Sequence, residues 1–129
     1  MTRKTKPEKL TTADLFERGC SLFRSGQYKD ASSYFRLLTL MAPANGSYFA
    51  ALGHALKKLG DLEGALPPYH AAVMLGGQDQ PDLMFSLAET LKMLGHKIAA
   101  LKALKQAILY ADPAFKARLK MIQMNWRQS

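Results

Sequence analysis

Cysteine and histidine are the residues of this sequence best suited to covalent or metal chemistry, and their spacing argues against both. His54, His70 and His96 are 16 and 26 positions apart, and the sequence has neither a His-Glu-x-x-His nor a Cys-x-x-Cys pair. The ligand spacing of common zinc sites is therefore absent. Cys20 has no neighbouring histidine that could activate it, and the glycines form no phosphate-binding loop. We expect no catalytic residue, no metal and no cofactor, hence a protein that is not an enzyme.

The composition indicates a small folded protein. The chain has 129 residues, of which 48% are hydrophobic and 22% are charged, which suits one compact domain. No apolar run approaches the roughly 18 to 20 residues that span a bilayer. The basic start of the chain is not followed by an unbroken apolar segment, which argues against a secretory signal. A single cysteine suits a reducing compartment. We expect a cytoplasmic protein without stable membrane insertion.

The net charge of +8 lies mainly at the two ends of the chain. Residues 1–9 contain four basic residues and one acidic residue, and residues 114–129 contain four basic residues and no acidic one. The residues between them hold the other 10 basic and 9 acidic residues, so the body of the chain is nearly neutral. Basic ends could contact RNA or a membrane surface, but they are more often solvated tails. A nucleic-acid partner is therefore not expected.

A threefold repeat in the sequence predicts the structural elements that position the cysteine and the histidines. Six positions recur along the chain, at a spacing of 34 residues from the first copy to the second and of 35 from the second to the third. The three sets are Leu15, Gly19, Gly26, Ala31, Phe35 and Pro43; Phe49, Gly53, Gly60, Ala65, Tyr69 and Gly77; and Met84, Ala88, Gly95, Ala100, Leu104 and Asp112. A unit of this size cannot bury its apolar face alone and must stack on its neighbours.

The pattern within each unit predicts two helices. Small residues at Gly19, Gly53 and Ala88 let the first helix approach the second, while Phe35, Tyr69 and Leu104 are expected to fill the space between adjacent pairs. This pattern resembles the tetratricopeptide repeat over residues 12–113. It implies an all-α fold, in which three helix-turn-helix repeats form a right-handed solenoid. The expected parts are a flexible basic arm at 1–11, one domain at 12–129 with repeats at about 12–45, 46–80 and 81–113, and a capping helix at 114–127.

Pro67 and Pro68 conflict with this pattern, because they fall about six residues into the second helix of the second copy. A proline inside a helix removes an amide donor and crowds the carbonyl four residues earlier. We predict a kink there, or a helix that effectively begins near Pro67. Two interpretations remain open: the prolines are an irregularity that the helix tolerates, or they form a bend that contacts a partner.

The candidate binding residues lie on the face of each first helix that is not used for packing. They mix aromatic anchors with hydrogen-bonding groups, which suits an extended peptide held in a groove. The set is Phe16, Cys20, Phe23 and Arg24 in the first copy, Ala50, His54 and Lys57 in the second, and Phe85, Glu89 and Met93 in the third. The alternative is that Phe16 and Phe23 pack under the N-terminal arm or the capping helix.

Five segments of the sequence indicate a narrower family among the tetratricopeptide-repeat proteins. They are Leu22 to Ala31, Tyr34 to Leu38, Leu52 to Leu56, Ser86 to Leu91 and Ala99 to Leu104. Together they resemble class II chaperones of bacterial type III secretion, over about residues 13–112. The resemblance implies a bacterial cytoplasmic chaperone that captures an extended segment of a hydrophobic translocator. It also implies that five residues match groove positions of the family: Phe16, Cys20, Phe23, Phe85 and Glu89. Cys20 stands where the family has a bulkier apolar residue, which enlarges that pocket. The question whether the chain forms a homodimer is left open.

Two other function classes remain. A generic repeat adaptor would bind a peptide or tail of another protein without any secretion system. A nucleic-acid binder would use the basic ends and would show strongly salt-dependent affinity.

Overall fold

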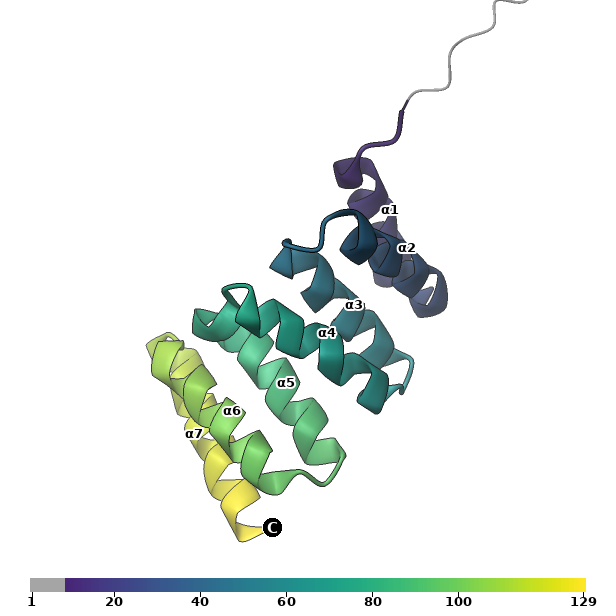
Figure 1. Ribbon diagram of the computed structural model, residues 1–129. Helices are drawn as coiled ribbons and strands as arrows, with labels where there is room; N and C mark the ends of the chain where they lie inside the picture. Colours follow the sequence, from purple (N-terminus) through teal and green to yellow (C-terminus); the bar gives the residue numbers. More distant parts are fainter. Residues whose placement is uncertain (1–8) are drawn as a thin grey trace, which may run out of the picture.

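The computed structural model describes residues 9–129, and this part of the chain folds into seven α-helices and no strand (Figure 1). The helices are α1 Thr12–Arg24, α2 Tyr28–Met41, α3 Gly46–Lys58, α4 Leu62–Met74, α5 Pro81–Met93, α6 Lys97–Tyr110 and α7 Pro113–Gln128. The expected all-α class is confirmed. The flexible arm expected at 1–11 lies largely outside the described residues.

Local signals in the sequence explain where the helices begin and end. Thr11 caps α1 by accepting a hydrogen bond from the Asp14 amide, and the Asp14 side chain accepts one from the Thr11 amide in return. Gly26 and Gly60 follow the first helices with φ angles of 81° and 82°, a conformation that glycine adopts without strain. The turn between α4 and α5 contains a short 3-10 helix, Gly77–Asp79. This longer turn accounts for the extra residue before the third copy.

In the first two copies, the first helix contacts the second through a glycine. A Cβ atom at Gly19 would lie 2.6 Å from Cε1 of Phe35, and one at Gly53 would lie 2.7 Å from Cδ1 of Tyr69. Both rings are almost fully buried. These rings were expected to fill the space between adjacent helix pairs. That expectation is incomplete, because each ring also packs closely on the glycine of its own pair.

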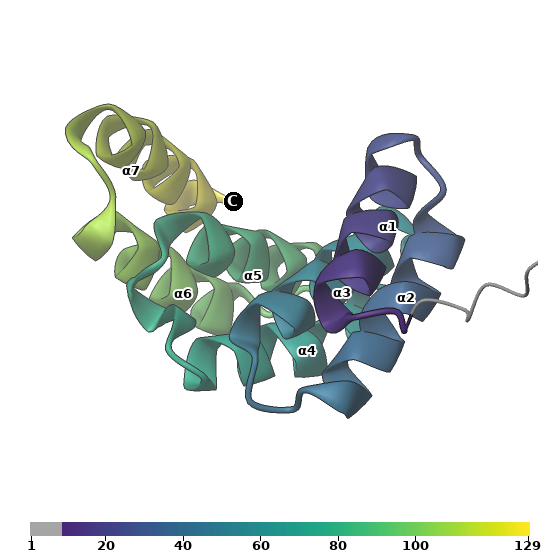
Figure 2. The ribbon, with the colours of Figure 1, turned by 90° about the horizontal axis from the view of Figure 1, so that it is seen from above.

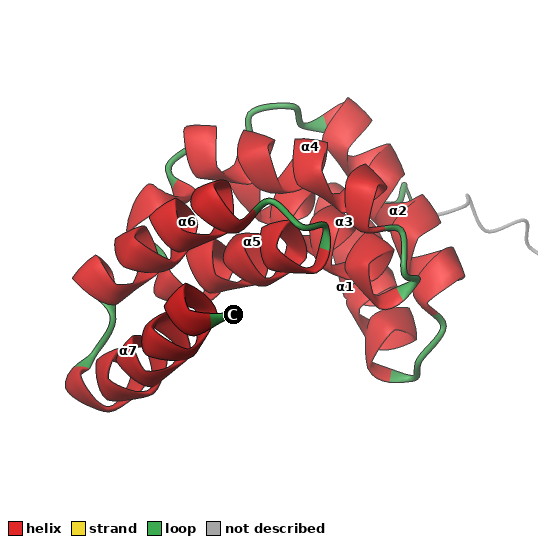
Figure 3. Cartoon of the chain, turned by 90° about the horizontal axis from the view of Figure 1, so that it is seen from below, coloured by secondary structure: helices red, strands yellow, loops and turns green. Residues whose placement is uncertain are grey.

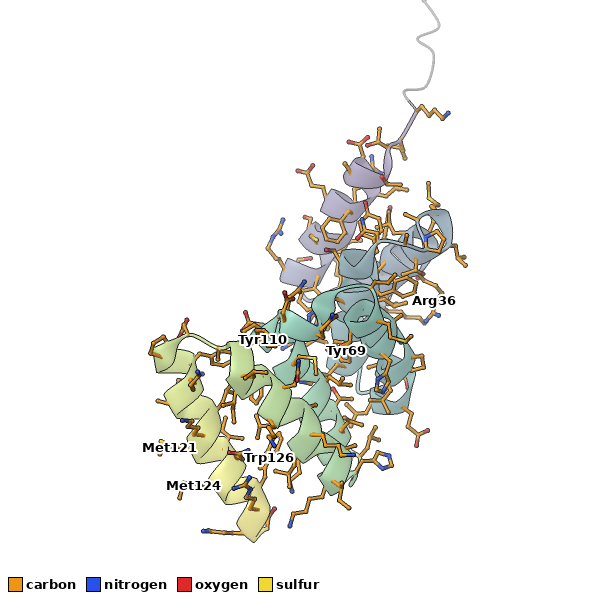
Figure 4. All side chains as sticks on the ribbon, turned by 60° about the vertical axis from the view of Figure 1, so that its left-hand side comes forward. Arg36, Tyr69, Tyr110, Met121, Met124 and Trp126 are labelled. Carbon is orange, nitrogen blue, oxygen red and sulfur yellow. The ribbon has the colours of Figure 1, made fainter. Side chains whose placement is uncertain are left out.

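The helix pairs stack in series into a crescent. Figures 2 and 3 show α1, α3 and α5 along its inner side and α2, α4 and α6 along its outer side. The last helix, α7, packs on α6 through buried Leu119, with Ile122 and Trp126 against the same core. Met121 and Met124 lie on the opposite, exposed side of α7 (Figure 4). This arrangement fits the expected capping helix.

The two prolines do not interrupt α4, which is helical from Leu62 to Met74. The expected start near Pro67 is therefore wrong, because Asp61 fixes the first turn ahead of the prolines. Its carboxylate accepts a hydrogen bond of 2.9 Å from the Gly64 amide. A bend of α4 at Pro67 stays a prediction. Within residues 9–129, no helix is long and apolar enough to cross a bilayer.

Candidate binding groove

Half of the predicted site residues come together in one hollow between α1 and α3. The hollow has a volume of about 280 Å³ and an almost entirely apolar lining. It is lined by Phe16, Cys20, Phe23, Arg24, Phe35, Ala51 and His54. The helices α1 and α3, which lie on the inner side of the crescent (Figure 2), provide six of the seven lining residues.

The aromatic walls of this hollow are held by neighbouring rings. The ring centroid of Phe16 lies 5.2 Å from that of Tyr48 in α3 and 5.8 Å from that of Phe35 in α2. Phe23 meets Tyr28 edge-on at 5.1 Å, at the start of α2. Such contacts stabilise the positions of the rings beyond the burial of their area. Figure 2 shows α7 at the opposite end of the crescent from α1, so the capping helix does not cover these two rings.

Cys20 lies in the lining of the hollow as a half-buried free thiol. Burial raises the pKa of this thiol, and the nearby Arg24 opposes the shift only in part. A reactive cysteine needs a lowered pKa, because the thiolate is the nucleophile. Cys20 is therefore suited to shape the hollow rather than to react.

His54 forms the polar edge of the hollow and is fixed by a buried hydroxyl. Its Nδ1 lies 2.7 Å from Oη of Tyr69, and the two rings meet edge-on. Burial lowers the pKa of His54, and the positive charges of Lys57 and Lys58 lower it further. Burial also raises the pKa of Tyr69. Both groups are thus neutral near pH 7, which leaves the edge of the hollow polar but uncharged apart from Arg24.

Lys57 and Glu89 are joined in an ion pair between α3 and α5. The Lys57 Nζ and Glu89 Oε1 atoms are 2.9 Å apart, and the two side chains are 21% and 41% exposed. The sequence suggested that both groups could bind a peptide backbone. In the free protein they bind each other instead, so a ligand must either use their remaining hydrogen-bonding capacity or separate them.

The third copy contributes a different kind of surface. Phe85 of α5 packs edge-on against Phe115 of α7, with ring centroids 6.0 Å apart, and the Arg118 guanidinium lies over the Phe115 ring. The terminal helix therefore partly covers the aromatic anchor predicted at this end of the groove. Met93 is 64% exposed near the end of α5 and takes no part in the hollow.

Two lining residues were missed, and Ala50, which was predicted for the same groove, lines a different hollow. Ala50 lines a separate hollow of about 220 Å³, together with Ser47, Gln80 and Leu83 among others. Its neighbour Ala51 takes the place expected for it beside α1. Phe35 was assigned only to the core, yet one part of its ring lines the hollow. No sequence signal separates these roles, because a ring between two helices can serve both.

The described residues contain no cluster of three or more metal-binding side chains.

Comparison with known proteins finds no matching family model and no matching curated protein. Solved structures do match. The Yersinia enterocolitica type III secretion translocator chaperone SycD is 20% identical, with a TM-score of 0.83 over 93% of this chain and 88% of SycD. PcrH, which is known from Pseudomonas aeruginosa, is 24% identical in its complex with the chaperone-binding region of PopD. That match has a TM-score of 0.85 over 95% of this chain and 98% of PcrH.

SycD is also known with a peptide of the translocator YopD, at 22% identity and a TM-score of 0.84 over 96% of this chain and 98% of that one. A further SycD structure, again 22% identical, is described as an alternative dimer, with a TM-score of 0.82 over 96% of this chain and 97% of that one. At these identities the likeness establishes the arrangement of the helices. This chain therefore has the fold of the type III secretion translocator chaperones.

Proposed function

We propose that this protein is a non-enzymatic chaperone of the bacterial cytoplasm that binds an extended, apolar segment of a type III secretion translocator in its concave groove. The observation that carries the proposal is the apolar hollow between α1 and α3, two helices on the inner side of the crescent. The fold match supports it, because PcrH and SycD are known in complexes with translocator segments. Binding would keep the translocator soluble and competent for export.

Each part of the groove has a distinct task in this proposal. The hollow formed by Phe16, Cys20 and Phe23 receives an apolar side chain of the client, where burial supplies most of the affinity. Arg24 and His54 at its edge can hydrogen-bond to the client backbone. The other predicted residues, Ala50, Lys57, Phe85, Glu89 and Met93, extend the contact toward α7. In this proposal residues 12–129 act as one binding unit, and the groove extends from the hollow over the third copy.

The most direct test fills the hollow instead of emptying it. Phe16→Ala with Phe85→Ala would remove binding anchors, but both rings also hold neighbouring helices together. Cys20→Phe adds a phenyl group to the hollow and removes little. The matched control is Ser21→Phe, because Ser21 is exposed on the same helix and lies outside the hollow.

The probes are two fluorescently labelled peptides, from the chaperone-binding region of PopD and from YopD, titrated with the full chain. We expect binding to at least one probe, a loss of about tenfold or more in affinity with Cys20→Phe, and no loss with Ser21→Phe. Binding to neither peptide would contradict the proposed client. Equal binding by the two variants would contradict the assigned groove.

A further inference from the structure

The outer side of the crescent exposes an apolar side chain at the same repeat position in all three copies. Leu40, Met74 and Leu109 are separated by the repeat spacings of 34 and 35 residues. Their exposed fractions are 76%, 86% and 64%. Single exposed hydrophobic residues are common and need no explanation. Three at one repeat position form a row along the second helices α2, α4 and α6.

Each of these residues follows a nitrogen-bearing side chain by one helical turn. Arg36, His70 and Lys105 stand four residues before Leu40, Met74 and Leu109 respectively, and positions four apart lie on the same face of a helix. All three are exposed. Figure 4 shows Arg36 directed away from the body of the protein. We call these six residues the outer row.

The basic groups of the outer row have no ion-pair partner among the described residues. The ion pair found in residues 9–129 is Lys57–Glu89, which lies between first helices. The third of the second helices, α6, contains Lys97, Lys102 and Lys105 and no acidic residue. Arg36 and Lys105 therefore place positive charge beside exposed apolar groups, and His70 places a hydrogen-bonding ring at the same position of the second copy.

A second set of apolar residues widens this surface. Met41, Leu75 and Tyr110 follow the apolar members of the outer row directly in the sequence and are 49%, 43% and 49% exposed. The surface is thus apolar at the C-terminal end of each second helix and basic one turn earlier.

We propose that the outer row is a docking surface for an acidic, amphipathic segment of a protein partner. Apolar side chains of the segment would cover Leu40, Met74 and Leu109, and its carboxylates would face Arg36, His70 and Lys105. The surface lies on the side of the crescent opposite the hollow, so it can be occupied while the groove holds a client. The proposal stands independently of the client proposed above.

The observations favour this occupant over two others. In a symmetric contact between two copies of the chain, the same patch faces itself, which would bring the basic members of the two rows together. A bilayer attracts basic and apolar groups, but it is flat on this scale. The outer side is convex (Figure 3), so a flat surface would meet only part of the row, whereas a peptide can follow it.

The test uses a synthetic 28-residue helical peptide, about 42 Å long at 1.5 Å per residue, with leucines on one face and glutamates beside them. A peptide of the same composition in scrambled order, without an apolar face, is the first control. The full-length protein is compared with the variant Leu40→Ser, Met74→Ser and Leu109→Ser. Because these side chains are exposed, the variant should fold, which circular dichroism checks. Cys20→Phe serves as the groove control.

We expect the acidic peptide to bind more tightly than the scrambled one and more weakly as salt is added. The triple variant should lower its affinity about tenfold or more, which corresponds to losing one or two well-buried apolar contacts, and Cys20→Phe should leave it unchanged. Failure of the peptide to bind, or equal binding by the triple variant, would overturn the proposal. So would two other outcomes that depend on the row: binding to phosphatidylglycerol vesicles in place of the peptide, or a dimer in sedimentation that the triple variant abolishes.

Discussion

On the inner side of the crescent the apolar side chains converge, since Phe16, Cys20 and Phe23 of α1 share one hollow with Ala51 of α3. On the outer side the exposed apolar side chains are spread over successive helices, with Leu40 on α2 and Met74 on α4. The two sides also differ in their ion pairs. On the first helices Lys57 is paired with Glu89, whereas the basic groups of the outer row have no ion-pair partner within the described residues. One repeat thus produces two faces with different distributions of apolar and charged groups. Apolar side chains of the first helices line one hollow, whereas the exposed apolar side chains of the second helices lie on three separate helices.

The largest expected difference between the two sides is in stability. Phe35 is 2% exposed and supports both the core and the hollow, so Phe35→Ala should lower the free energy of unfolding by about 3–5 kcal/mol. Leu40→Ala, five residues later on the exposed side of α2, should change it by less than about 0.5 kcal/mol. Urea denaturation followed by circular dichroism measures both. Similar losses would mean that Leu40 is part of the packed core after all.

A smaller effect is expected at the contact between the inner and outer helices of one pair. In Gly53→Ala the new methyl group would lie 2.7 Å from the Tyr69 ring. Overpacking costs about 1–3 kcal/mol, offset by up to about 1 kcal/mol of improved helix propensity, so we expect a net loss of about 1–2 kcal/mol. Ser47→Ala, a change near the start of the same helix, is the control. A stabilised Gly53→Ala protein would show that the ring moves aside freely.

The ion pair on the inner side should contribute less. A double-mutant cycle with Lys57→Met and Glu89→Gln should give a coupling energy below about 1 kcal/mol, because both side chains are partly exposed. A parallel cycle with Lys105→Met in place of Lys57→Met should give no coupling with Glu89. Coupling of Glu89 to Lys105 would remove the electrostatic difference between the two faces.

The smallest expected effect is a pH dependence caused by one imidazole. Burial lowers the pKa of His54 from its ordinary value of 6.5, so the unfolded chain binds this proton more readily than the folded one. Stability should therefore fall as the pH decreases below about 6.5, and it should be fully present above that value. His54→Gln should reduce this slope between about pH 7 and pH 5 in urea denaturation. An unchanged slope would assign it to other groups.

The sequence predicted the fold closely because the repeat specifies it at many independent positions. Glycines at helix ends, small residues at helix contacts and a capping threonine all indicate the same helices. Pro67 misled the prediction of where α4 begins. Because Asp61 caps the first turn of α4, the helix can continue through Pro67. The presence of the proline alone does not indicate that the helix continues.

The candidate site was predictable only in part. Helical periodicity brought together the residues of α1 that line the hollow, but it could not show that Lys57 and Glu89 bind each other. Nor could it place Ala51 rather than Ala50 beside α1, since that depends on the rotation of α3 relative to α1. The contact between Phe85 and Phe115 likewise depends on where α7 packs relative to α5. These contacts between copies are tertiary, and the repeat pattern within one copy does not specify them.

The central claim, that the hollow between α1 and α3 holds the client, can be tested through Cys20, the single cysteine of the chain. The rate at which this thiol reacts with a disulfide reagent is measured at mildly basic pH, because its pKa is raised, with and without a saturating translocator peptide from PopD or YopD. We predict that the bound peptide slows the reaction at least about tenfold, because it covers the hollow, and that the triple variant of the outer row shows the same protection. A peptide that binds tightly and leaves the rate of Cys20 unchanged would contradict the account.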